Sequence, residues 1–159
     1  MLRAVIECRM TRIFVDADGC PVKLEVLHVA ERYGMQVSVV ANTRMSLPPD
    51  ENVERVVVGS GFDAADDWIA ARVSEGDIVI SGDIPLASRC LKQGAHVIDF
   101  KGKELTPETI GDAMGGRELM AYLRESGVAT GGPPPFEKKD RSRFLQRLDE
   151  VIQALRRRR

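Results

Sequence analysis

Short apolar segments alternate with amphipathic ones along most of this chain, and this alternation constrains the fold more than any other feature. Apolar runs typical of buried strands lie at 12–16, 36–40, 54–58, 77–80 and 95–100. Helical spacing of apolar residues is found at about 21–33, 63–74 and 83–92. Strands joined by helices of this length form β-α-β crossovers. The sequence therefore predicts an α/β fold, a three-layer α/β/α sandwich around a mainly parallel sheet.

The C-terminal third has a different pattern. Residues 115–125 are predicted to form a short helix, and the proline-rich segment 131–136 an extended connector. One apolar stripe then marks a final helix: Phe144, Leu145, Leu148, Val151, Ile152 and Leu155. Because such a stripe needs a partner surface, we expect this helix to pack on the body. A single domain is expected over 11–159, after an N-terminal extension at 1–10.

Composition excludes several classes of protein. A chain of 159 residues suits one domain, and 43% hydrophobic with 30% charged residues is ordinary for a globular protein. No apolar run approaches the roughly 18 residues of a membrane span, and charges interrupt any secretory signal. Three cysteines without C-x-x-C spacing indicate free thiols, and two histidines argue against a histidine-rich zinc site. We expect a cytoplasmic protein with no membrane partner.

The net charge of −1 hides an asymmetry along the chain. Residues 115–159 hold 11 Lys and Arg against 6 Asp and Glu, whereas the rest holds 12 against 18. This split is compatible with an acidic metal site beside a flank that binds a polyanion. It is equally what a solvated amphipathic helix with an arginine tail would give.

Acidic residues follow the ends of several predicted strands. Asp16 and Asp18 come after the first strand, Asp83 after the fourth and Asp99 at the end of the fifth. Three more follow the third strand: Asp63, Asp66 and Asp67. The carboxyl ends of parallel strands share one edge, where ligands bind in open α/β sheets. Crowded carboxylates favour a hard cation such as Mg²⁺ or Mn²⁺, so the sequence predicts a metal site there.

Structural roles compete with this interpretation. Asp18 begins a good turn sequence, and Asp63 and Asp83 are natural helix N-caps. Asp66 stands at the capping-box position, whereas Asp67 gains no capping role. Asn42, just past the second strand, could bind a phosphate or only form a turn.

Two local motifs suggest other folds. The segment 59–64 fits the dinucleotide-binding pattern G-x-G-x-x-A, but the following aspartates would occupy the helix start where a pyrophosphate must lie. The run VDADG at 15–19 is similar to the D-x-D loop of haloacid-dehalogenase-like phosphatases, although Cys20 stands where that loop has threonine. The phosphatase remains an alternative.

Four longer segments resemble one family. IFVDADGCPVK (13–23), VVVGSGFDAADDWIA (56–70), GDIVISGDIPLASRCL (76–91) and DRSRFLQRL (140–148) are similar to the bacterial YaiI/YqxD family, which has a PIN-like domain. The resemblance spans about 11–148, nearly the whole chain.

The resemblance implies the site of PIN nucleases, in which aspartates hold Mg²⁺ or Mn²⁺ and activate water against a phosphodiester. Asp16, Asp67 (or Asp63) and Asp83 would be catalytic, and Asp18 and Asp63 would also be metal ligands. We expect Asn42, Ser81 and Arg141 to contact the substrate. The predicted function is a metal-dependent nuclease acting on RNA. Besides the phosphatase, a non-catalytic nucleic-acid-binding module of the same fold stays open.

Overall fold

A six-stranded sheet organises the molecule, in the strand order β3-β2-β1-β4-β5-β6. The computed structural model describes residues 11–59, 61, 63–111 and 135–158. The strands are β1 (Arg12–Asp16), β2 (Gln36–Ala41), β3 (Val53–Val57), β4 (Ile78–Ile80), β5 (His96–Ile98) and β6 (Glu104–Leu105). All pairs are parallel except β5–β6. The predicted mainly parallel sheet is confirmed.

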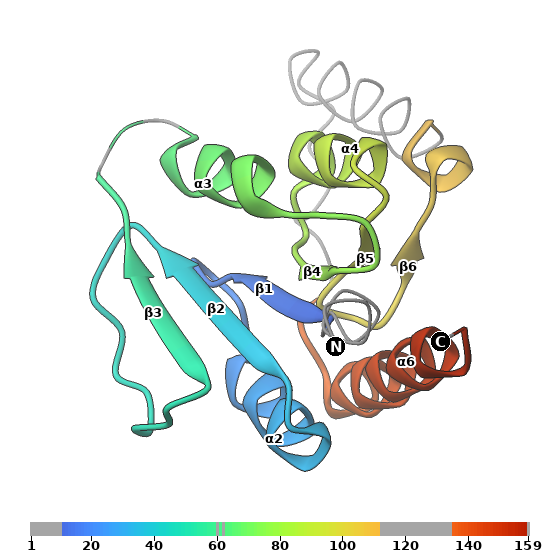
Figure 1. Ribbon diagram of the computed structural model, residues 1–159, viewed down its shortest axis with the longest axis horizontal. Helices are drawn as coiled ribbons and strands as arrows, with labels where there is room; N and C mark the ends of the chain where they lie inside the picture. Colours follow the sequence, from blue (N-terminus) through green and yellow to red (C-terminus); the bar gives the residue numbers. More distant parts are fainter. Residues whose placement is uncertain (1–10, 60, 62, 112–134, 159) are drawn as a thin grey trace, which may run out of the picture.

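Helices cover both faces of the sheet (Figure 1). On one face lie α2 (Lys23–Tyr33) and α6 (Lys138–Arg157), and on the other α3 (Ala64–Arg72) and α4 (Ile84–Lys92). A separate apolar core fills each interface. The predicted three-layer sandwich is therefore confirmed. The expected extension at 1–10, the short helix at 115–125 and most of the connector at 131–136 lie outside the described residues.

The register of the sheet brings the predicted strand ends to one edge. Asp16 pairs with Val40 of β2, and Val15 pairs with Ile80 of β4. The residues that follow β1, β2 and β4 therefore leave the sheet side by side. Strand β6 was not predicted, because two residues carry no readable periodicity. It pairs antiparallel with β5, Val97 opposite Leu105.

Helix α6 packs on the body through its predicted apolar stripe. Phe144, Leu148, Val151 and Ile152 are buried in the core under α2 and α6, and Leu145 and Leu155 pack at its margin. Polar contacts fix the same interface, including a hydrogen bond from the Tyr33 hydroxyl to Asp149. The predicted burial of this stripe is confirmed.

Cys20 and Cys90 are buried free thiols, as predicted. Burial raises the pKa of Cys20 to about 11 and that of Cys90 to about 12, so both stay protonated and unreactive near neutral pH. No helix in the described part of the chain has the length and apolar character needed to cross a membrane.

Gly102, in the turn between β5 and β6, is held against the backbone of α6. Its φ is +90°, and a Cβ there would lie 2.6 Å from the carbonyl carbon of Arg143. Both the backbone conformation and the contact exclude a side chain. We therefore expect Gly102→Ala to lower the free energy of unfolding by about 2–4 kcal/mol, measured by urea denaturation. Gly111→Ala, where a Cβ meets nothing within 4 Å, is the control. An equal effect of the two would contradict the close packing at Gly102.

Candidate metal-binding pocket

The carboxyl edge of the sheet carries a hollow of about 400 Å³, here called the acidic pocket. Five carboxylates line it: Asp16, Asp18, Asp63, Asp66 and Asp83. Asn42, Gly61, Ala64 and Ala65 complete the wall. No lysine or arginine is found among these lining residues. Residues from the ends of β1, β2 and β4 and from the start of α3 are thus brought together around concentrated negative charge.

Ser81 connects the carboxylate of Asp16 with the backbone of Asp83. Its side chain is fully buried, and its hydroxyl donates to Asp16 Oδ2 at 2.9 Å. The Ser81 Oγ also accepts the backbone N–H of Asp83 at 3.0 Å. This bridge joins the loop after β4 to the end of β1, and it orients the Asp16 carboxylate relative to Asp83.

Asp18 and Asp83 combine structural contacts with a place in the acidic pocket. Asp18 Oδ2 accepts the backbone N–H of Asn42 at 2.9 Å, which ties the loop after β1 to the end of β2. Asp83 is the N-cap of α4, with Oδ1 accepting the backbone N–H of Leu86 at 2.9 Å. A capping role and a pocket role therefore coexist, since each carboxylate has a second oxygen.

Capping does not explain the acids at the start of α3. Asp63 stands at the N-cap position, but its φ of 62° is left-handed and its side chain makes no capping hydrogen bond. A left-handed non-glycine residue costs about 1–2 kcal/mol and marks a constrained backbone. Both Asp63 and Asp66 instead line the acidic pocket. The capping roles considered from the sequence are not observed at this helix.

Asp67 lies outside the acidic pocket. Its carboxylate Oδ1 is 2.8 Å from Nη1 of Arg89 on α4, and its side chain is 65% exposed. The structure therefore brings Asp16 and Asp83 together with Asp66 rather than with Asp67. Sequence reasoning had treated Asp66 as a capping residue. No local signal separated Asp66 from Asp67, because spacings of three and four residues from Asp63 both lie on one side of a helix.

Crowding and burial disfavour the charged state of these acids. Burial first, and then the neighbouring Asp83, Asp16 and Asp63, raise the pKa of Asp66 to about 7, against an opposing effect of Arg89. Burial also raises the pKa of Asp16; the hydrogen bond from Ser81 lowers it in part, and Asp83 and Asp18 raise it. Within the described residues, the negative charge of the acidic pocket is therefore compensated only in part, by Ser81 and Arg89.

Two residues predicted to contact the substrate, Ser81 and Arg141, make contacts within the protein. Ser81 is fully buried and donates to Asp16, so it supports the acidic pocket, and its substrate role stays a prediction. Arg141 of α6 uses Nη1 to contact both oxygens of Glu25 at 2.8 Å and lies over the Phe136 ring. It holds α6 to α2. Asn42 lines the acidic pocket, and its substrate role stays a prediction.

The raised pKa of Asp66 predicts a pH dependence of stability. The folded protein binds this proton more tightly than the unfolded chain, whose value is near 3.8. Stability of the metal-free protein should therefore fall as pH rises from about 4 to about 7, and Asp66→Asn should remove that part of the decline. Urea denaturation in EDTA across this range measures it. The exposed Asp67→Asn is the control, and an equal loss of pH dependence there would contradict the assignment.

The donor chemistry fits a hard divalent cation, but the side chains do not form a ready ligand set. Within the described residues, no three His, Cys, Asp or Glu side chains are gathered tightly enough to hold one metal ion. Mg²⁺ commonly keeps several waters and takes only one or two carboxylates from the protein. Oxygen donors without a compensating cation are consistent with that mode of binding.

Comparison with known proteins places the whole chain in one group. The chain is 54% identical to a UPF0178 protein of Rhodopseudomonas palustris strain HaA2, over 96% of this chain and 93% of that one. It is 54% identical to a UPF0178 protein of Rhodospirillum centenum, over 93% and 99%. No solved structure matches. A family model described as "Uncharacterized BCR, YaiI/YqxD family" matches residues 14–154, so the chain belongs to the YaiI/YqxD family.

Proposed function

We propose that this protein is a metal-dependent nuclease that hydrolyses phosphodiester bonds of RNA at the acidic pocket. The observation that carries the proposal is the gathering of five carboxylates, with no lysine or arginine among the described lining residues, at the edge of the sheet where α/β proteins bind ligands. Burial and the neighbouring carboxylates raise the pKa of Asp16 and Asp66, which Ser81 and Arg89 offset only in part. A bound cation would compensate the remaining charge.

The residues divide into distinct tasks. Asp16 and Asp83, linked through Ser81, would hold Mg²⁺ or Mn²⁺ from two adjacent strands, and Asp66 would face them from α3. Asp18 and Asp63 would add negative charge at the rim. The metal, when bound, supplies polarisation of the phosphate and a more acidic water. The carboxylates orient that water and accept its proton, so a nucleophilic side chain is not required.

The phosphatase alternative has less support. A haloacid-dehalogenase-like mechanism forms an aspartyl phosphate on Asp16, and the dianion needs a nearby cationic side chain. The described lining residues include none. Release of inorganic phosphate from small monoesters, with labelling of Asp16, would nevertheless establish the phosphatase and overturn the nuclease.

Incubation of the purified protein with single-stranded RNA, duplex RNA and DNA tests the proposal. We expect cleavage of RNA in Mn²⁺ or Mg²⁺ and none in EDTA. The non-catalytic binding module would instead bind RNA in EDTA and leave it intact in every metal. Intact RNA with both metals, in a preparation that shows a metal-dependent rise in melting temperature, would exclude the nuclease and leave a metal-binding protein.

A further inference from the structure

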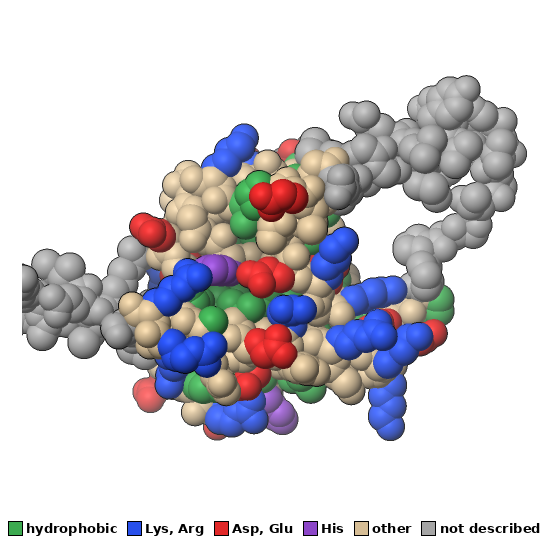
Figure 2. Space-filling model, turned by 90° about the vertical axis from the view of Figure 1, so that its right-hand side faces the viewer, with side chains coloured by type: hydrophobic (Ala, Val, Ile, Leu, Met, Phe, Trp, Pro, Cys, Tyr) green, Lys and Arg blue, Asp and Glu red, His purple; other side chains and the backbone are tan. Residues whose placement is uncertain are grey.

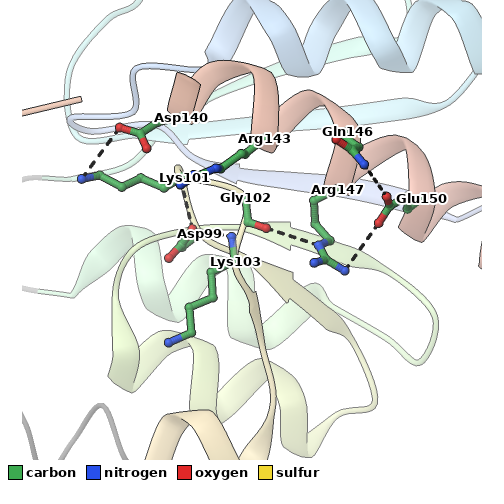
Figure 3. Close-up of a pocket in the computed structure, with 9 residues that line it drawn as sticks. All are labelled: Asp99, Lys101, Gly102, Lys103, Asp140, Arg143, Gln146, Arg147 and Glu150. Carbon is green, nitrogen blue, oxygen red and sulfur yellow. Dashed lines mark hydrogen bonds and ion pairs between the residues drawn. The ribbon is translucent and has the colours of Figure 1, made fainter. Parts of the chain in front are cut away.

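A second hollow, of about 420 Å³, lies between the β5–β6 turn and α6 (Figure 3). We call it the α6 groove and define it by its four cationic side chains: Lys101, Lys103, Arg143 and Arg147. The lysines come from the turn and the arginines from the helix; Lys101 reaches toward Asp140, and the Lys103 side chain extends away from α6 (Figure 3). The close contact of Gly102 with the backbone of Arg143 fixes the distance between its two walls.

The acidic side chains of the α6 groove are engaged in local contacts. Asp99 accepts the backbone N–H groups of Lys101 and Lys103, both at 2.9 Å. Asp140 is buried and accepts the backbone N–H of Glu137 at 2.8 Å. Their charge is therefore partly satisfied by peptide groups of the turn and the helix start.

Two of the cations have no such partner. Lys103 and Arg143 are exposed, and neither forms an ion pair or side-chain hydrogen bond within the described part of the chain. Arg147, by contrast, donates to the Gly102 carbonyl at 3.3 Å and pairs with Glu150 at 3.5 Å. The α6 groove thus offers one unpaired cation from the turn and one from the helix, and such charge attracts a polyanion.

The α6 groove neighbours the acidic pocket along the sheet edge. Asp16 ends β1 and Asp99 follows β5, with β4 between them. Two strand spacings amount to roughly 10 Å. The loops also touch, because the Gly82 backbone lies against the Phe100 ring. A Cβ added at Gly82 would be 3.6 Å from Cε2 of that ring. Further basic side chains, Arg157 and Arg158, line the adjoining hollow along α6. Figure 2 shows Lys and Arg side chains interspersed with Asp and Glu on the right-hand side of the molecule as drawn in Figure 1.

We propose that the α6 groove binds the phosphates of single-stranded RNA next to the bond presented to the acidic pocket. This inference rests on the proposed function and assigns its substrate-binding surface. The proposed ligand is a single strand, and binding of a duplex is an outcome of the test. No aromatic side chain is among its lining residues, so bases have no stacking platform there. Recognition is therefore of the backbone, with little dependence on base sequence.

The test is binding of fluorescein-labelled single-stranded RNA in EDTA, followed by anisotropy over a range of salt concentrations. The double variant Lys103→Gln/Arg143→Gln removes the two unpaired cations. It should bind roughly tenfold more weakly. The slope of the logarithm of the binding constant against the logarithm of the salt concentration should become shallower by about 1.4, which corresponds to the loss of two phosphate contacts to a single strand. The matched control is Arg55→Gln/Lys92→Gln, which removes two exposed charges from β3 and α4. This control should bind as wild type does.

Three outcomes overturn the proposal: wild type that does not bind at low salt, equal losses in both double variants, and a duplex that binds as tightly as the single strand. Cleavage assays separate this inference from the nuclease itself. If Mn²⁺-dependent cleavage and RNA binding both survive the groove variant, the α6 groove is not the binding surface and the nuclease stands. If RNA binding depends on the α6 groove but no cleavage occurs, the α6 groove is an RNA-binding surface and the proposed nuclease activity is wrong.

Discussion

Replacing Asp16 or Asp83 with asparagine is expected to lower Mn²⁺-dependent cleavage of RNA by about a hundredfold or more. Each change removes one charge and nearly keeps the shape. In Asp83→Asn the amide oxygen can still cap α4, and in Asp16→Asn it can still accept the hydrogen bond from Ser81. Loss of activity would therefore reflect loss of cation binding and not loss of the fold.

Stability measurements separate the metal role from a structural one. If the carboxylates hold a cation, the metal-free acidic pocket is repulsive, so both variants should be at least as stable as wild type in EDTA. Wild type should gain about 2.7 kcal/mol when Mn²⁺ exceeds its Kd a hundredfold, and the variants should gain much less. A wild type without any metal-dependent rise in melting temperature, with variants that melt lower in EDTA, would show that these aspartates are structural.

The same assays decide between the two neighbouring acids of α3. Asp66→Asn is expected to weaken the response to Mn²⁺, because Asp66 lines the acidic pocket. Asp67→Asn should affect it much less, because that carboxylate pairs with Arg89 at the surface. The reverse result would show that Asp67 is the residue of α3 that binds the metal, as the family resemblance implies.

Deletion of the chain from Asp140 onward is expected to abolish stable folding. The deleted helix buries Phe144, Leu148, Val151 and Ile152 against the sheet and α2. At about 1.5–3 kcal/mol for each large side chain, their burial contributes roughly 6–12 kcal/mol. This is comparable with the whole stability of a typical domain, about 5–15 kcal/mol. Circular dichroism should show no cooperative melting transition in the truncated protein.

Point variants on α6 give the matched comparison. Phe144→Ala should cost about 3–5 kcal/mol, since the ring is fully buried. Gln146→Ala, two residues along on the exposed side, should change stability by less than about 0.5 kcal/mol. A truncated protein that melts cooperatively at the wild-type temperature would show that α6 is a detached arm.

The sequence by itself determined the layers and the position of the site. β-Branched runs and helical periodicity identified five strands and four helices close to their observed bounds, because each has enough residues to display its period. The rule that parallel strands end at one edge then placed Asp16, Asp18 and Asp83 together. The stripe on α6 similarly indicated its burial.

Only the tertiary structure decided which side chains of that edge share a pocket. Asp66 and Asp67 are adjacent in sequence, and the pattern could not fix the rotation of α3 about its axis. Packing of Ala65 and Ile69 into the core set that rotation, which turned Asp66 toward Asp16 and Asp67 toward Arg89. Strand β6 and the α6 groove were equally hidden. Both depend on contacts between segments that are far apart in the sequence, such as that of Gly102 with Arg143. Local periodicity carries no information about such contacts.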